Sequence, residues 1–164
     1  NMATKNNNLS AFDSKKVPSG RGKKIGIVIS EWNAEITEGL KEGAIEVLLE
    51  CGTYSRDILT EYVPGTFELP LGAQFLLESK GVDAVIAIGC VVRGETAHFD
   101  YVCQGATHGI QEVGLHYNKP VMFCVLTDDT IEQSRARSGG KYGNKGIEAA
   151  IGALKMLSLK DKYK

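Results

Sequence analysis

Short apolar runs alternate with longer amphipathic stretches along most of this chain, and the alternation limits the folds that it can adopt. Residues 24–30 and 83–89 are almost entirely apolar, as expected of strands that are buried on both faces. Further strands are predicted at residues 57–63 and 121–126. Each run is followed by apolar residues at the three- and four-residue spacing of a helix, so the sequence predicts a series of strand–helix units.

Cap and turn residues mark where the helices begin. Asn33 is a candidate cap for the first helix, and Pro70 suits the first turn of the second. The third helix follows His98, a short helix is predicted at residues 130–138, and the last helix covers residues 144–159. We therefore expect an α/β fold, a three-layer sandwich in which a four-stranded parallel, flavodoxin-like sheet is flanked by helices.

The length and charge of the chain restrict its organisation and its partners. The 164 residues suffice for a single domain, placed here at residues 23–164 after a flexible N-terminal arm at residues 1–22. This arm is a candidate extra strand for the sheet of a neighbouring subunit. The net charge of −1 gives no attraction to nucleic acid, and no apolar run is long enough to span a membrane.

Cysteine usage and the N-terminal sequence indicate the compartment. The four cysteines lack the close spacing of a zinc or redox site, so we expect buried, reduced thiols and no bound metal. No signal peptide is visible at the N-terminus. The protein is therefore expected in the cytoplasm.

The densest group of chemically active side chains lies at residues 89–101. This segment joins the end of a predicted buried strand to the start of a helix, where open α/β sheets bind ligands. Free main-chain N–H groups at a helix start favour an anion, and His98 beside them can transfer protons near neutral pH. The segment is therefore interpreted as a phosphate pocket with an acid–base group.

Parallel topology should bring other residues to the same edge of the sheet. Trp32 and Asn33 follow the first strand, residues 66–68 follow the second, and Cys90 begins the loop after the third. Phe123 on the fourth strand, with the acidic pair after it, is expected at the same place.

Three motifs, taken in series, resemble lumazine synthase, the 6,7-dimethyl-8-ribityllumazine synthase of riboflavin biosynthesis. They are residues 63–70 (VPGTFELP), 93–102 (RGETAHFDYV) and 143–146 (GNKG). The resemblance covers roughly residues 23–159, in order and with the spacings of the family. It implies a transferase that condenses 5-amino-6-(D-ribitylamino)uracil with 3,4-dihydroxy-2-butanone 4-phosphate, releasing phosphate and water, without a cofactor or metal. This reaction is the penultimate step of riboflavin biosynthesis.

The resemblance also implies a role for each site residue. His98 matches the catalytic histidine, and Glu95, Thr96 and Arg137 match the segment and the arginine that bind the ketone phosphate. The positions that match contacts to the pyrimidine substrate are Trp32, Thr66, Phe67, Glu68, Cys90, Val91, Val92 and Phe123. Asn33, Lys145 and Glu148 are expected to support the site. In the family, the arginine and the equivalents of Phe123 and Lys145 come from the neighbouring subunit.

Taken alone, several of these residues also fit structural roles. Trp32 and Phe123 fit a hydrophobic core, and Glu68 suits the first turn of a helix. Glu95 and Thr96 fit an ordinary strand-to-helix turn.

Two other classes of protein share the strand–helix order. A flavodoxin-like receiver or nucleotide-binding domain would need more acidic residues after the first strand than Glu31 alone. A non-catalytic flavin- or lumazine-binding protein, or a shell-forming protein of the same fold, would not need His98 and Arg137. Phosphate release on mixing both substrates distinguishes the enzyme from these alternatives.

The resemblance implies a homo-oligomer with small-molecule substrates. Lumazine synthases form pentamers, and some assemble pentamers into hollow icosahedral shells. The turn at residues 139–143 is short, which is compatible with a shell. Riboflavin synthase is a further expected partner.

Overall fold

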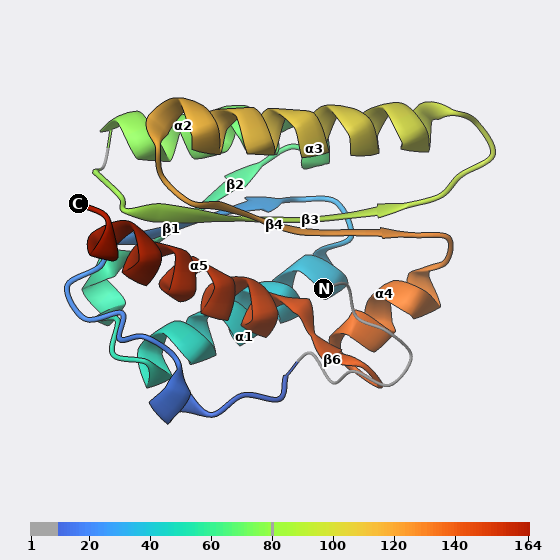
Figure 1. The fold of residues 1–164 in the computed structure, drawn as a ribbon. Coiled ribbons are helices and arrows are strands. Elements are labelled where there is room, and N and C mark those ends of the chain that lie inside the picture. The colour runs from blue at the N-terminus through green and yellow to red at the C-terminus, as the bar shows by residue number, and fades with distance from the viewer. Residues whose placement is uncertain (1–9, 80) are drawn as a thin grey trace.

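The computed structural model describes residues 10–79 and 81–164, and these form a parallel sheet between two layers of helices (Figure 1). The sheet contains β1 (Ile25–Ser30), β2 (Ile58–Val63), β3 (Ala84–Val92) and β4 (Val121–Asp128) in the order β2-β1-β3-β4. All neighbouring strands are parallel, so all four end at the same edge of the sheet. The predicted fold class is confirmed.

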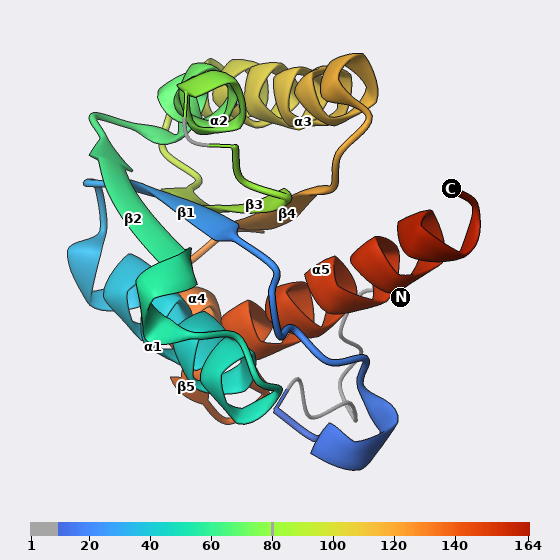
Figure 2. The same cartoon turned by 90° about the vertical axis from the view of Figure 1, so that its left-hand side faces the viewer.

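Each face of the sheet is covered by helices. One face packs against α2 (Leu69–Ser79) and α3 (His98–Tyr117), and the other against α1 (Ala34–Glu50) and α5 (Lys145–Lys162) (Figures 1 and 2). The short α4 (Ile131–Arg137) lies on the same side as α1, beyond the end of β4. This arrangement explains the continuous apolar runs of the central strands, because alternate side chains enter different cores.

Two apolar cores therefore flank the sheet. Ile27 and Ile86 belong to the core beneath α1 and α5, whereas Val28 and Val85 belong to the core beneath α2 and α3. All four side chains are fully buried. Burying each such side chain stabilises the fold by about 1.5–3 kcal/mol, so the central strands form a rigid base for the loops at their carboxyl ends.

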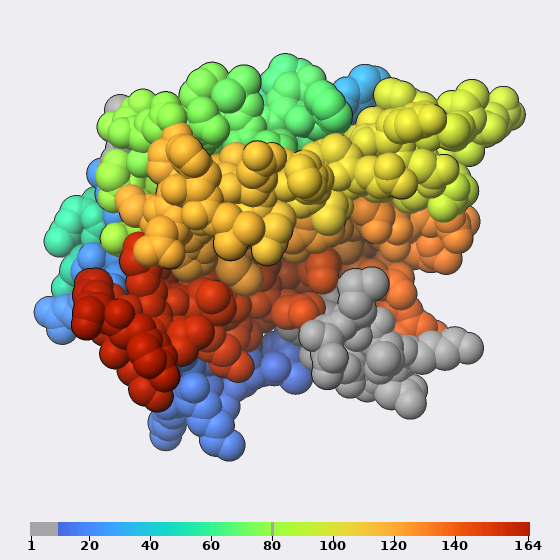
Figure 3. Space-filling view, turned by 45° about the horizontal axis from the view of Figure 1, so that its top comes forward, coloured from blue at the N-terminus to red at the C-terminus, as the bar shows by residue number. Residues whose placement is uncertain are grey.

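The described part of the expected N-terminal arm packs against its own chain. It contains a 3-10 helix at Ser14–Lys16, and Phe12 and Val17 contact the core beneath α1 and α5. The Gly20 amide donates to the Cys51 carbonyl oxygen at 2.8 Å. Figure 3 shows this dark blue segment beside the red α5. Strand addition to a neighbouring subunit stays a prediction, and residues 1–9 lie outside the described part of the chain.

Three local features differ from the sequence-based expectations. β3 continues to Val92, because Val91 and Val92 pair with the end of β4, which itself reaches Asp128. Asn33 occupies the cap position of α1 but makes no side-chain capping bond. The predicted glycine-rich break contains a small antiparallel ribbon, β5 (Ser138–Gly140) with β6 (Gly143–Asn144).

Short 3-10 helices precede β2 and α2. The first, η2, is Ser55–Asp57, and the second, η3, is Thr66–Glu68. Because η3 directly precedes α2 at the carboxyl edge of the sheet, it presents three consecutive predicted site residues there. No helix in residues 10–79 or 81–164 is both long and apolar enough to cross a membrane.

Candidate active site

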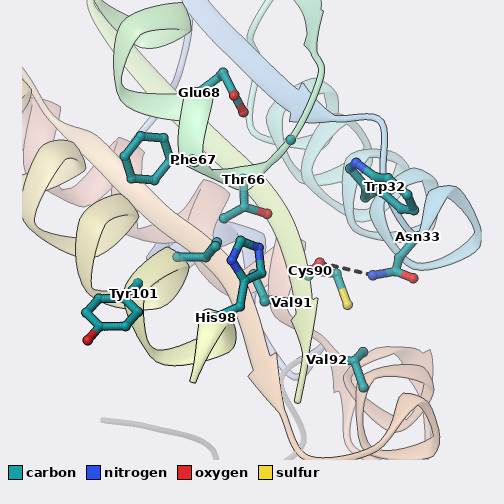
Figure 4. A pocket seen from close by; sticks show the side chains of 12 residues that line it. Trp32, Asn33, Thr66, Phe67, Glu68, Cys90, Val91, Val92, His98 and Tyr101 are labelled. Atoms are coloured by element: carbon teal, nitrogen blue, oxygen red, sulfur yellow. Dashed lines mark hydrogen bonds between the residues drawn. The ribbon is translucent and has the colours of Figure 1, made fainter. Parts of the chain in front are cut away.

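A hollow of about 580 Å³ lies at the carboxyl edge of the sheet, between the ends of β1 and β3 and the start of α3. Its lining comes from three of the four segments that the topology predicted to meet there, and the fourth segment, with Phe123, contributes no residue. The lining residues are Trp32, Asn33, Gly65, Thr66, Phe67, Glu68, Cys90, Val91, Val92, His98, Tyr101 and Val102. Figure 4 shows Trp32 on one side, Phe67 and Tyr101 on the other, and His98 between them. We call this space the first hollow.

Trp32 forms one wall of the first hollow and is not part of a core, since its side chain is 71% exposed. The turn that carries it is held at both ends. The Glu31 amide donates to the Val63 carbonyl oxygen at 3.0 Å, and the Asn33 side-chain amide donates to the Cys90 carbonyl oxygen at 3.1 Å (Figure 4). Asn33 adopts a left-handed conformation with φ of 58°, which asparagine tolerates better than most residues. Asn33 therefore positions Trp32 and does not cap α1.

The opposite wall is the exposed face of η3. Phe67 is 60% exposed, and its ring stands against Gly105 of α3, where an added Cβ would lie 2.6 Å from a ring carbon. Thr66 is buried and contacts the backbone of Gly89 on β3. Glu68 is exposed and points its carboxylate toward the turn at Gly65. The two aromatic rings, Trp32 and Phe67, give the first hollow apolar walls.

The floor of the first hollow is the last part of β3. Val91 and Val92 are half-buried there, whereas Cys90 is 2% exposed. The Cys90 thiol donates to the Ser134 hydroxyl at 3.4 Å, and that hydroxyl donates to the Asp128 carboxylate at 2.7 Å. Burial raises the pKa of the Cys90 thiol, so this residue is a poor nucleophile. Its contribution to the site is its backbone.

His98 is the first residue of α3 and its exposed side chain lines the first hollow. The His98 amide donates to the Thr96 hydroxyl at 3.3 Å. Among residues 10–79 and 81–164, no hydrogen-bond acceptor faces the main-chain N–H groups of Glu95 and Thr96. Unpaired amides at the start of a 20-residue helix favour an anion beside His98.

The described lining of the first hollow contains no lysine or arginine. Arg93, close in sequence, is held by Asp129 at 2.8 Å and by Asp100 at 3.5 Å. Arg137 ends α4, lines neither this hollow nor the one described next, and donates to the Gln133 carbonyl oxygen at 3.0 Å. A phosphate bound beside His98 would therefore find no lysine or arginine among the described residues that line the first hollow.

A second hollow of about 260 Å³ lies between β4 and α5. Phe123 lines it together with Lys145 and Glu148, whose charged groups are 3.9 Å apart. One carboxylate oxygen of Glu148 is buried without a hydrogen-bond partner among the described residues. The second hollow shares no residue with the first. Most of the predicted site residues therefore form two groups on one chain. Glu95 and Thr96, in the turn before His98, line neither hollow, and neither does Arg137.

Comparison with known proteins shows which family this chain belongs to. Residues 22–161 match the family model for 6,7-dimethyl-8-ribityllumazine synthase. The chain belongs to this family. A lumazine synthase of Cytophaga hutchinsonii is 56% identical over 157 residues, which are 96% of this chain and 98% of that protein. A lumazine synthase of Porphyromonas gingivalis is 54% identical over 158 residues, with the same coverage of both chains. The predicted family is confirmed.

Three residues that line the first hollow, Gly65, Tyr101 and Val102, were not predicted as site residues from the sequence. Tyr101 and Val102 line it from the first turn of α3, on the side of His98. Their spacing of three and four residues from His98 was the available signal, because such residues share a helix face. The lumazine synthase motif at residues 93–102 already contained both.

Proposed function

We propose that this chain is a 6,7-dimethyl-8-ribityllumazine synthase. It condenses 5-amino-6-(D-ribitylamino)uracil with 3,4-dihydroxy-2-butanone 4-phosphate and releases phosphate and water. The observation that carries the proposal is the first hollow, which combines exposed aromatic walls with a histidine beside unpaired amides. A flat heterocycle and a phosphate ester need these two kinds of surface.

The pyrimidine lies between the walls of the first hollow. Trp32 supplies a large π-face for stacking, and the ring of Phe67 supports the opposite edge. Main-chain groups of β3 near Val91 and Val92 pair with the polar edge of the heterocycle. Glu68 accepts hydrogen bonds from the ribityl hydroxyls, and the Thr66 hydroxyl accepts from or donates to them. This arrangement needs the backbone of Cys90 and not its thiol.

The ketone phosphate binds at the start of α3. The amides of Glu95 and Thr96 and the Thr96 hydroxyl donate to the phosphate oxygens. Arg137 of the neighbouring subunit completes the site with a bidentate, charge-assisted pair of hydrogen bonds to the phosphate. The lack of a lysine or arginine in the described lining of the first hollow supports this sharing.

The second hollow of the neighbouring subunit closes the site from the other side. It contributes Phe123 as an apolar surface, with Lys145 and Glu148 as charged support. A site of this kind exists only in an oligomer, which is a ring of five subunits in the proposed assembly. Icosahedral shells, association with riboflavin synthase and a cytoplasmic location remain predictions.

The reaction is driven mainly by proximity. The amine of the pyrimidine attacks the ketone carbon, and loss of water gives a Schiff base. Removal of a proton from the neighbouring carbon then breaks the C–O bond to phosphate, and the resulting enol tautomerises to a new ketone. The ribitylamino nitrogen closes onto this new carbonyl carbon with loss of a second water. His98 transfers protons during imine formation and elimination, a role typically worth about 10²–10⁴-fold in rate. Holding the two reactants side by side supplies much of the remaining acceleration.

The direct test mixes both substrates with the purified protein. Lumazine, measured by its fluorescence, and phosphate should form in equal molar amounts. The rate of their formation should be proportional to protein concentration. Omission of either substrate is the control. Binding of the product lumazine without any turnover would favour the alternative, a non-catalytic flavin- or lumazine-binding protein of the same fold.

A further inference from the structure

Ser134 is the only residue of α4 whose side chain is buried, and it is 0% exposed. The rest of this seven-residue helix is half-buried or exposed. A buried hydroxyl must be hydrogen-bonded to be tolerated, so its partners determine how α4 is seated.

The Ser134 hydroxyl joins the ends of β3 and β4 to α4. It donates to the Asp128 carboxylate of β4 at 2.7 Å, and it accepts from the Cys90 thiol of β3 at 3.4 Å. The direction of both bonds is fixed, because a carboxylate can only accept and the serine has one proton to donate. Rotation of α4 about its axis would break both bonds, whereas a purely apolar contact would tolerate some rotation.

Arg137 lies three residues after Ser134, less than one helical turn away. Among residues 10–79 and 81–164, its guanidinium contacts only the Gln133 carbonyl oxygen, at 3.0 Å, and the face of Tyr142, whose ring centroid is 5.0 Å away. None of these contacts is to a carboxylate in the described part of the chain. Arg137 is therefore available to an anion, and its place depends on how α4 is seated.

The ion pair that joins α4 to α1 is less suited to holding α4 in place. Arg135 meets Glu35 at 2.9 Å, but both side chains are more than half exposed. Exposed pairs contribute little to stability and hold geometry weakly. The buried junction formed by Ser134, Asp128 and Cys90 is the more rigid attachment.

We propose that Ser134 is a positioning residue for ketone-phosphate binding. Through Asp128 and Cys90 it fixes α4 to the sheet and so places the Arg137 guanidinium where the phosphate of the neighbouring site binds. This inference rests on the proposed function. It assigns to Ser134 no contact with either substrate.

The first test compares KM values of the Ser134→Ala variant for the two substrates. Loss of one charge-assisted bond to phosphate should raise KM for the ketone phosphate about tenfold. KM for the pyrimidine should stay within about twofold, because its walls come from other elements. Val82→Ala is the matched control. Val82 is fully buried in the connection between α2 and β3, before the amino end of β3 and so away from the carboxyl ends of the strands. It should lower the melting temperature and leave both KM values unchanged.

The second test asks whether Ser134 acts through Arg137. In an Arg137→Ala background, Ser134→Ala should cause no further rise in KM for the ketone phosphate. A further rise of the same size would show an independent effect and would overturn the proposal. If Ser134→Ala fails to fold, Asp128→Ala replaces it in both tests, because it removes the acceptor of the Ser134 hydroxyl and should raise the ketone-phosphate KM in the same selective way.

The outcomes separate this inference from the proposed function. If the wild-type protein makes no lumazine, the proposed function is wrong. If the wild type is active and Ser134→Ala leaves the ketone-phosphate KM unchanged, or raises both KM values equally, only the role of Ser134 is wrong.

Discussion

Two impaired variants of this chain should recover activity when they assemble together. His98→Ala damages the first hollow, and Arg137→Ala removes the cation that lines neither hollow of its own chain. If each site takes its histidine from one subunit and its arginine from the next, a mixed ring contains sites with both residues intact. If each site took both residues from the same subunit, no site in a mixed ring would be intact, and the variants could not complement each other.

The expected recovery follows from counting subunit pairs. At equal amounts of the two variants, each position in a ring carries either variant with equal chance. About one quarter of the sites then combine an intact histidine with an intact arginine, whatever the number of subunits. Alone, His98→Ala should be slower by about 10²–10⁴-fold, and Arg137→Ala should lose about tenfold or more in kcat/KM for the ketone phosphate.

Co-expression of the two variants with different tags, followed by purification through both tags, gives the mixed assemblies. Lumazine formation at limiting ketone phosphate should reach about one quarter of the wild-type rate per subunit. The control mixes the two variants after separate purification, which should give only the average of their own rates. Co-assembled protein with no more activity than that control would refute the shared site.

The remaining predictions concern the stability of the fold. Gly146→Ala should lower the free energy of unfolding by about 3 kcal/mol in urea titrations, because an added Cβ on α5 would overlap the Leu40 carbonyl oxygen of α1. Gly152→Ala on the same helix is the control, since its Cβ would meet only the flexible end of Met122, and equal losses in both variants would contradict this account. Hydrogen bonds from Lys23 and Lys164 lower the pKa of Asp161 from 3.8 to about 2. Its stabilising effect should therefore be complete above pH 3.8 and disappear as the pH falls through about 2, so the difference in unfolding midpoint between wild type and Asp161→Asn should vanish there; a constant difference would contradict the assignment.

The strand–helix order was predictable because burial on both faces leaves a strong sequence signal. The runs around Ile27 and Ile86 are apolar at nearly every position, and both are central strands. Strand ends were less predictable. Val91 and Val92 extend β3 because β4 lies beside them, and this pairing depends on residues more than thirty positions away.

The site was predictable where one segment holds several of its residues. His98 and η3 lie where the topology places them, at the carboxyl edge of the sheet. Phe123 does not reach the first hollow, since it pairs with Ala87 within the sheet and not at the end of β4. The role of Asn33 depends on the Cys90 carbonyl oxygen of a different strand, which no local pattern records.

Because Phe67 packs against Gly105, a substitution at position 105 can alter substrate choice indirectly. A methyl group at position 105 would overlap the ring edge and force the ring to move, so the wall that Phe67 forms would change shape. Gly105 itself does not line the first hollow. Selection for a smaller or larger heterocycle can thus act through a residue that the ligand never touches.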